Sequence, residues 1–285
     1  MTTDSSLVRI GTMGSNFDIE YRWAAPAGAA SGPVVVFLHE GLGSVSMWRD
    51  FPDRVCAALG LRGLVYSRAG YGRSTPRAPG ERWQPDYMHR QAREALPALL
   101  AALDVKAPYL LFGHSDGASI ALIHAAAFPD RVAALVVLAP HIFVEDISVR
   151  SIEAARRDYL DTDRFRKLAR HHADVDSAFW GWNDIWLDPA FRDWNIEPLL
   201  GAIRCPVLAV QGRDDEFGTL AQIDGIAAVL PGTRRLVLDE CHHSPHRDQP
   251  EAVIAATHEF VAECGNAQPV PGAAAETREP AAPLP

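Results

Sequence analysis

The stretch Tyr109-Leu-Leu-Phe-Gly-His-Ser-Asp-Gly117 decides the fold, because an apolar run enters a tight turn there and a helical pattern follows it. It contains the pattern G-x-S-x-G, in which Gly113 and Gly117 flank Ser115 two residues away on either side. In a strand–turn–helix setting this turn is so sharp that side chains at the two glycine positions would clash. We therefore predict that Ser115 stands clear of a sheet, at the N-terminus of a helix over residues 116–128.

Short apolar runs alternate with helical patterns on both sides of this stretch. Fully apolar strands that alternate with helices indicate a parallel sheet covered on both faces. Two earlier segments, residues 7–12 and 17–23, alternate polar and apolar residues and predict an antiparallel edge hairpin. The predicted core strands cover residues 33–39, 61–67, 109–112, 132–138, 206–210 and 235–238. The predicted helices cover residues 48–59, 86–103, 116–128, 219–230 and 250–262.

Residues 141–203 interrupt this rhythm, because helical patterns, many charges and dense aromatic residues replace strong strands there. Four of the seven tryptophans lie close together in this region: Trp180, Trp182, Trp186 and Trp194. We predict that residues 141–203 form a helical cap over a core made of residues 1–140 and 204–265. Residues 266–285 are mostly Ala and Pro, cannot bury enough apolar surface to become ordered, and are predicted to be a disordered tail.

A serine hydroxyl is a weak nucleophile unless a base removes its proton during the attack. The loop after the last predicted strand, Asp239-Glu-Cys-His-His-Ser-Pro-His-Arg-Asp-Gln-Pro250, offers three candidate bases: His242, His243 and His246. Such a base needs a carboxylate that orients it and stabilises its charged form. The segment after residues 206–210, Gln211-Gly-Arg-Asp-Asp-Glu-Phe217, offers three carboxylates: Asp214, Asp215 and Glu216.

Acyl transfer also needs N–H donors aimed at the negative oxygen that develops on the substrate. The backbone N–H of Asp116 follows Ser115 directly, at the first turn of the predicted helix. A second donor is expected from the loop His39-Glu-Gly-Leu-Gly-Ser44, which follows the strand at residues 33–39. By position, the N–H of Gly41 is preferred and that of Glu40 is the alternative.

Together, these motifs resemble those of the α/β-hydrolase superfamily over about residues 34–261. The quoted stretches around Ser115, Asp215 and Gly41 take part in the resemblance, as do Ser67-Arg-Ala-Gly-Tyr-Gly-Arg-Ser74 and residues 243–250. The resemblance implies an α/β-hydrolase fold, a mostly parallel central sheet flanked by helices with a helical cap insertion.

The resemblance also selects among the open candidates. His-x-Pro followed by an acidic residue, Gln and Pro selects His243 as the base, with His242 where the family usually has glycine. The family pattern Gly-x-x-Asp selects Asp215 over Asp214, and the order of Ser115, Asp215 and His243 is the one expected for this fold. Glu40 departs from the family, which usually has glycine at that position.

The cap resembles those of small esterases and of carbon–carbon bond hydrolases. The expected function is therefore a cofactor-free serine hydrolase that cleaves a small carboxylic ester or lactone through a Ser-His-Asp triad and an acyl-enzyme. The alternatives are hydrolysis of a carbon–carbon bond in a diketone or ring-cleavage product, and a ligand-binding module with low turnover. Family members that attack through a carboxylate are disfavoured because position 115 is serine. Expected substrate contacts are Glu40, His114, Trp180, Trp182 and Trp186.

Composition narrows the range of partners. The 285 residues carry a net charge of −9, which opposes binding to nucleic acid or to an anionic membrane surface. No apolar run is long enough to span a bilayer, and the start resembles no secretion signal. Four scattered cysteines fit buried thiols, so a cytoplasmic location is expected. We expect a small-molecule ester-like substrate and neither a metal nor an organic cofactor, and the oligomeric state stays open.

Overall fold

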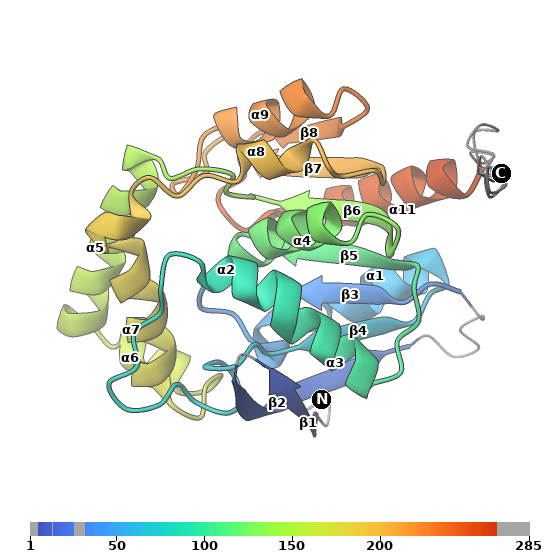
Figure 1. The fold of residues 1–285 in the computed structure, drawn as a ribbon. Coiled ribbons are helices and arrows are strands. Elements are labelled where there is room, and N and C mark those ends of the chain that lie inside the picture. The colour runs from blue at the N-terminus through green and yellow to red at the C-terminus, as the bar shows by residue number, and fades with distance from the viewer. Residues whose placement is uncertain (1–4, 13, 26–31, 267–285) are drawn as a thin grey trace, which may run out of the picture.

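A twisted eight-stranded sheet runs through the described residues of this computed structural model, which are 5–12, 14–25 and 32–266 (Figure 1). The strand order is β1-β2-β4-β3-β5-β6-β7-β8. β1 pairs antiparallel with β2 and β2 with β4, and the remaining neighbours are parallel. The strands are β1 (Ser6–Thr12), β2 (Ser15–Ala24), β3 (Val35–Leu38), β4 (Gly63–Tyr66), β5 (Tyr109–His114), β6 (Val132–Leu138), β7 (Val207–Gly212) and β8 (Arg234–Leu238). The predicted mostly parallel sheet with an antiparallel edge hairpin is confirmed.

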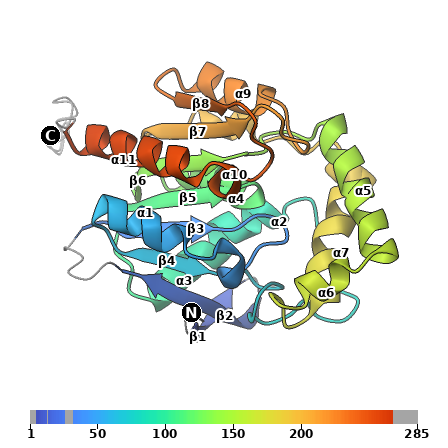
Figure 2. The same cartoon turned by 180° about the vertical axis from the view of Figure 1, so that it is seen from behind.

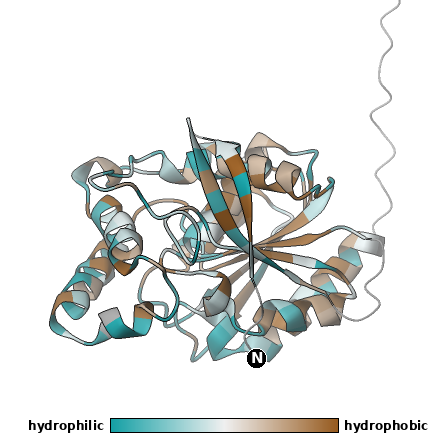
Figure 3. Cartoon of the chain, turned by 90° about the horizontal axis from the view of Figure 1, so that it is seen from below, coloured by the Kyte–Doolittle hydropathy of each residue, from teal (hydrophilic) through white to brown (hydrophobic). Residues whose placement is uncertain are grey.

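The central strands are continuous apolar runs because both of their faces are buried. In β5, Leu111 packs into the core on one side of the sheet, while Leu110 and Phe112 pack into the core on the other side. In β3, Val36 and Phe37 divide between the two cores in the same way. Successive strand side chains point to opposite faces, so a strand covered on both sides needs apolar residues at every position. Hydropathy colouring shows this apolar character along the sheet (Figure 3).

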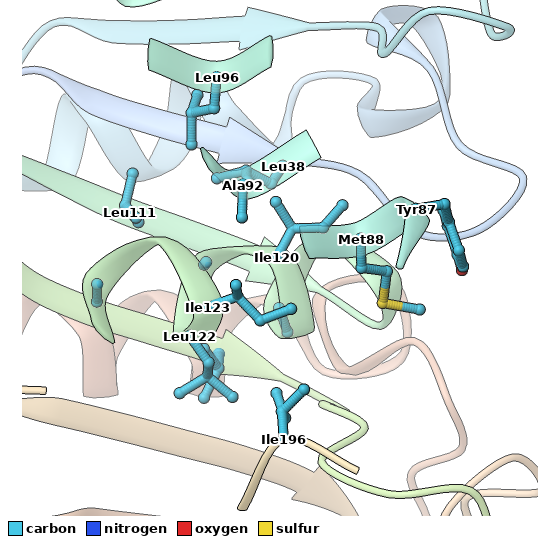
Figure 4. Packing of buried hydrophobic residues seen from close by; sticks show 14 of the residues in the cluster. Leu38, Tyr87, Met88, Ala92, Leu96, Leu111, Ile120, Leu122, Ile123 and Ile196 are labelled. Carbon is cyan, nitrogen blue, oxygen red and sulfur yellow. The ribbon is translucent and has the colours of Figure 1, made fainter. Parts of the chain in front are cut away.

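Two layers of helices cover the sheet. α1 (Phe51–Leu59) and α11 (Pro250–Asn266) pack against each other on one face, with the short α10 (Pro245–Asp248) leading into α11 (Figure 2). On the other face, α4 inserts Ile120 and Ile123 near Met88 and Ala92 (Figure 4). That face carries α2 (Tyr87–Arg90), α3 (Leu96–Ala102), α4 (Asp116–Ala127) and α9 (Ala221–Val229). The predicted helix over residues 86–103 forms as α2 and α3 joined by a π-helical turn, η2 (Gln91–Ala95).

Between β6 and β7 the chain forms helices. They are α5 (Asp146–Asp161), α6 (Arg164–Leu168), α7 (Val175–Trp186), the 3-10 turn η3 (Pro189–Phe191) and α8 (Glu197–Leu200). Of these, α5, α6 and α7 stand beyond one end of the sheet (Figures 1 and 2). α5 packs on α7, whereas α8 contacts the core helices α4 and α9.

The predicted disordered tail lies outside the described residues apart from Asn266, which ends α11. Within the described ranges, no helix combines the length and apolar character that crossing a membrane requires.

The turn from β5 into α4 holds Ser115 in a backbone conformation with φ 53° and ψ −121°. A positive φ is unfavourable for a residue with a side chain, so the surroundings must enforce it. A Cβ added at Gly113 would lie 2.5 Å from the carbonyl oxygen of Gly117, and one added at Gly117 would lie 2.1 Å from that of Leu38. Glycine at both positions is therefore a steric requirement of the turn.

We predict that Gly117→Ala lowers the free energy of unfolding by at least about 2 kcal/mol, because backbone atoms of β3 must move to admit the methyl group. Gly201→Ala is the matched control, because Gly201 has φ −60° and a Cβ there would lie 4.0 Å from Val229 Cγ1. That variant should change the free energy by no more than about 1 kcal/mol. Urea unfolding of both variants measures the difference, and equal stabilities would contradict the steric argument.

Candidate active site

Three side chains from distant parts of the sequence meet at the carboxyl ends of parallel strands. Ser115 follows β5, Asp215 follows β7, and His243 follows β8. Ser115 Oγ lies 2.9 Å from His243 Nε2, and His243 Nδ1 lies 2.9 Å from both carboxylate oxygens of Asp215. Parallel strands share one carboxyl edge, so loops far apart in the sequence can supply one constellation there.

Asp215 is held as an ionised hydrogen-bond acceptor. Its Oδ1 accepts the backbone N–H groups of Phe217 and Gly218, and its Oδ2 accepts from Gln211 Nε2 at 2.6 Å. Burial alone would raise the pKa of this carboxyl. The charge of His243 and its hydrogen bond, with help from the Phe217 N–H, outweigh burial and bring the pKa of Asp215 below its ordinary value.

Burial would lower the pKa of His243, but the neighbouring Asp215 carboxylate outweighs it, and the net pKa is raised above the ordinary imidazole value. The Nδ1–H donates to Asp215, so Nε2 is left as an acceptor for the Ser115 hydroxyl. The imidazole therefore has the tautomer and the orientation that a base for Ser115 requires.

The other candidate histidines and carboxylates are not part of the series formed by Ser115, His243 and Asp215. Asp214 is exposed, and its backbone carbonyl accepts from Nδ1 of the exposed His242. Glu216 is exposed, and its carboxylate accepts the backbone N–H of His243 at 3.3 Å. His246 is the second residue of α10 and is buried against the ring of Trp48. Of these candidates, the fold places His243 beside Ser115 and Asp215 beside His243.

Two backbone N–H groups are expected to bind an oxyanion, those of Gly41 and Asp116. In the described part of the chain, neither has a protein hydrogen-bond partner. The N–H of Asp116 is at the first position of α4, where helix geometry leaves it unpaired. Gly41 lies under the indole of Trp182, and a Cβ there would lie 2.2 Å from Trp182 Nε1. Glycine at position 41 therefore lets the cap pack directly on this loop.

Glu40, the departure from the family pattern, joins two loops. Its carboxylate lies 3.3 Å from Arg247 Nη2 and 3.6 Å from Nδ1 of the buried His114. Burial would raise the pKa of Glu40, but the neighbouring His114 imidazole, followed by the charge of Arg247, brings it well below the ordinary value. Glu40 is therefore charged, and it links the loop after β3 to α10.

Two expected substrate contacts are not in the cavity above Ser115. His114 lies behind the site, where its Nε2 donates to the backbone carbonyl of His243 at 2.7 Å. Trp180 packs edge-on against Tyr159 and lies under the guanidinium of Arg156. For Trp180 the reason is helical geometry, because a residue two positions from Trp182 is rotated by about 200° around α7 and faces away from the cavity.

The cavity above Ser115 has a volume of about 170 Å³. It includes Trp182 and Trp186 from the cap, as expected, and Glu40 at its wall. Its apolar lining comes from Leu42, Met47, Ile152, Ala155, Leu168, Trp182, Trp186 and Phe217. Its other lining residues are Glu40, Gly41, Ser115, Asp116, His141, His243 and Arg247. A larger cleft of about 960 Å³ around Arg49, Arg73 and His171 contains none of these residues.

His141 lines the cavity and was not identified from the sequence. Its Nε2 lies 3.5 Å from Ser115 Oγ, and its backbone N–H and carbonyl both contact the hydroxyl of Ser119. Burial, followed by the charge of His243, lowers the pKa of His141 to about 3, so the ring is neutral at ordinary pH. Its place just past the carboxyl end of β6 was the available signal, since that edge also carries the other site residues.

The side chain of Asp116 points below the site into a buried polar network. It accepts from Tyr87 Oη at 2.8 Å and from Trp186 Nε1 at 3.2 Å, and it lies 3.7 Å from Arg68 Nη2. Burial raises the pKa of this carboxyl, while Arg68 and the two donors oppose the rise.

Among the described residues, no group of three or more His, Cys, Asp or Glu side chains is arranged to hold a metal ion.

Known proteins that are similar to this chain include hydrolases. Serine hydrolase BPHL from Homo sapiens is 29% identical over 195 residues, covering 64% of this chain and 63% of that relative, which is less than two thirds of its length. The 2-hydroxy-6-oxononadienedioate/2-hydroxy-6-oxononatrienedioate hydrolase of Comamonas testosteroni is 22% identical over 289 residues, covering 92% of this chain and 97% of the relative.

Among solved structures, a thermophilic esterase from Thermogutta terrifontis superimposes with a TM-score of 0.70 at 20% identity. The match covers 91% of this chain and 99% of the esterase, and it shows a shared fold. Residues 35–256 match the family model described as Alpha/beta hydrolase family, which is more than half of the chain. This protein therefore belongs to the alpha/beta hydrolase family.

Proposed function

We propose that this protein is a serine hydrolase that cleaves small, uncharged carboxylic esters or lactones through an acyl-enzyme on Ser115. The observation that carries the proposal is the hydrogen-bonded series from Ser115 Oγ through the His243 imidazole to the Asp215 carboxylate. Membership of a hydrolase family supports hydrolysis as the class of reaction.

In the proposed reaction, His243 accepts the proton of Ser115 as the serine oxygen attacks the substrate carbonyl, and Asp215 stabilises the imidazolium. The oxygen of the tetrahedral intermediate accepts hydrogen bonds from the N–H groups of Gly41 and Asp116. The leaving alcohol takes the proton from His243. A water molecule then attacks the acyl-enzyme in the same way, and the acid is released as Ser115 regains its proton.

The size of the cavity supports a small substrate. Its volume of about 170 Å³ is close to that of an engineered cavity of roughly 150 Å³ that holds benzene. An acyl group of a few carbons or a small lactone fits this space, whereas a long acyl chain would extend beyond it. The apolar lining favours an aliphatic or aromatic group over a strongly polar one.

The charges around the cavity support an uncharged substrate. Arg247 supplies the guanidinium among the residues that line the cavity. This cation is already paired, because the carboxylate of Glu40 lies 3.3 Å from its Nη2. A dicarboxylate would need cations that are free to pair with it, because a buried unpaired charge is costly. This argues against the kind of substrate in the name of the Comamonas testosteroni relative. Carbon–carbon bond hydrolysis remains the second candidate because that relative aligns over 92% of this chain.

A panel of esters tests the proposal. We expect aryl acetate and butyrate to be hydrolysed faster than aryl laurate, and a vinylogous 1,5-diketone to be cleaved more slowly than the short esters. Ser115→Ala should lower kcat/KM for the short esters by at least about 10³-fold, because it removes the nucleophile. Ser46→Ala is the control, because Ser46 is exposed and bonds to His171 outside the cavity.

Each other outcome of the panel has a meaning. Full turnover by Ser115→Ala would refute the proposed nucleophile, and preferential cleavage of the diketone would favour the second candidate. Tight binding of ester analogues without turnover, together with slow labelling of Ser115 by a fluorophosphonate, would identify a ligand-binding module instead.

The dependence of kcat/KM on pH tests the role of the Asp215–His243 pair. The raised pKa of His243 means that the neutral base forms only at higher pH, so kcat/KM should rise with a midpoint above about 6.5. Asp215→Asn should move this midpoint to lower pH and reduce the plateau by about 10⁴-fold, because the imidazolium loses its counter-charge. Asp214→Asn, at the exposed neighbour, should leave both values unchanged. An unchanged midpoint in Asp215→Asn would contradict the assignment.

A further inference from the structure

One buried arginine lies beneath both halves of the proposed oxyanion site. Arg68 follows β4, is only 1% exposed, and has its guanidinium 4.9 Å from the centre of the Tyr71 ring. Its Nη2 donates to the backbone carbonyl of Glu40 at 3.0 Å and lies 3.7 Å from Asp116 Oδ2. Arg68 does not line the cavity above Ser115, so any effect on the reaction must pass through these two residues.

The carbonyl of Glu40 belongs to the same peptide group as the N–H of Gly41. Besides Arg68, it accepts from His39 Nδ1 at 2.7 Å and from the backbone N–H of Gly43 at 3.1 Å. The carbonyl and N–H of a trans peptide point in opposite directions, so three donors on the carbonyl fix the direction of the Gly41 N–H. Hydrogen bonds to the carbonyl also polarise the amide and make its N–H a stronger donor.

His39 can keep its part of this arrangement at any ordinary pH. Its Nε2 accepts the backbone N–H of Arg68 at 3.0 Å, so the ring proton is on Nδ1, which faces Glu40. Burial, followed by the charge of Arg68, lowers the pKa of His39 well below its ordinary value, so the ring stays neutral. The imidazole therefore serves as a fixed donor.

The second half of the site is tied to Arg68 through a side chain. The Asp116 carboxylate is anchored by Arg68, Tyr87 and Trp186, and the backbone N–H of the same residue is the donor at the start of α4. A single guanidinium thus contacts the Glu40 carbonyl, whose peptide group carries the Gly41 N–H, and the carboxylate of Asp116. Both contacts are made by Nη2, and the planar guanidinium holds the N–H groups of that nitrogen in fixed directions.

We propose that Arg68 is a positioning residue that holds the backbone N–H groups of Gly41 and Asp116 in the geometry of an oxyanion hole. This inference rests on the proposed serine hydrolysis and extends it to a residue that the substrate does not touch. Its effect is on the transition state, because the two N–H groups bind the oxygen most strongly when that oxygen carries negative charge.

Arg68→Lys tests the proposal, because lysine keeps the charge but loses the planar set of donors. We expect kcat for the short esters to fall by about 10- to 100-fold with KM within about twofold, since removal of one complete oxyanion donor costs about 10²- to 10³-fold. Labelling of Ser115 by a fluorophosphonate should slow by a similar factor. The midpoint of the pH profile should not move, because His243 and Asp215 are untouched.

A matched control separates this effect from a general loss of stability. Arg22 is also buried, and its guanidinium donates to Asp53 at 3.0 and 2.7 Å, away from the site. Arg22→Lys should lower Tm while kcat per labelled active site stays that of the parent protein. If Arg68→Lys does not fold, the double variant Arg68→Met with Asp116→Asn removes both charges together and leaves no buried unpaired ion. That variant should show the same loss of kcat.

Hydrogen–deuterium exchange provides a readout that does not need turnover. Peptides covering residues 39–43 and 114–118 should exchange faster in Arg68→Lys than in the parent protein. In Arg22→Lys they should exchange at the same rate as in the parent. A kcat within twofold of the parent and unchanged exchange in these peptides would overturn the proposal. If the parent protein neither hydrolyses esters nor labels at Ser115, the proposed function fails, and exchange alone still decides whether Arg68 orders the two donors.

Discussion

The backbone of Gly117 lies so close to the carbonyl of Leu38 that no side chain fits between them, and the arrangement of the site depends on this contact. It presses the start of α4 against the end of β3. The N-terminus of the helix and the loop that follows the strand are therefore neighbours, and they carry the N–H groups of Asp116 and Gly41, which have no hydrogen-bond partner among the described residues. In the same turn Ser115 has a positive φ, and its hydroxyl lies 2.9 Å from Nε2 of His243.

Charged groups support this site from below. Arg68 and Asp116 are both almost fully buried, which is unfavourable for isolated ions. Here each charge has several polar neighbours: Arg68 contacts the Glu40 carbonyl, and Asp116 accepts from Tyr87 and Trp186. A rigid, well-connected polar network orients dipoles before a substrate arrives, and such preorganisation is the main physical means by which enzymes stabilise developing charge.

The cap takes part in the same arrangement. Trp182 and Trp186 are one helical turn apart on α7, so both face the sheet, and they meet Gly41 and Asp116 respectively. α7 therefore contacts both Gly41 and Asp116 and also lines the cavity. His172, between α6 and α7, adds a further connection, because its Nδ1 accepts from the Gly72 N–H and its Nε2 donates to the Leu42 carbonyl.

Much of the fold was predictable because local patterns carry it. Apolar runs predicted β3, β5 and β6, and the spacing of Gly113, Ser115 and Gly117 predicted the turn, since steric crowding there depends on neighbours in the chain. The shared edge of parallel strands brought the loops after β7 and β8 beside Ser115, and the family resemblance selected Asp215 and His243 within those loops. The tertiary structure alone decided that His141 faces Ser115, that Trp180 and His114 do not, and that Arg68 contacts both Glu40 and Asp116. The contacts of His141 and Arg68 depend on which side chains distant segments bring together, and neither periodicity nor motif spacing encodes contacts made across 26 or more residues of chain.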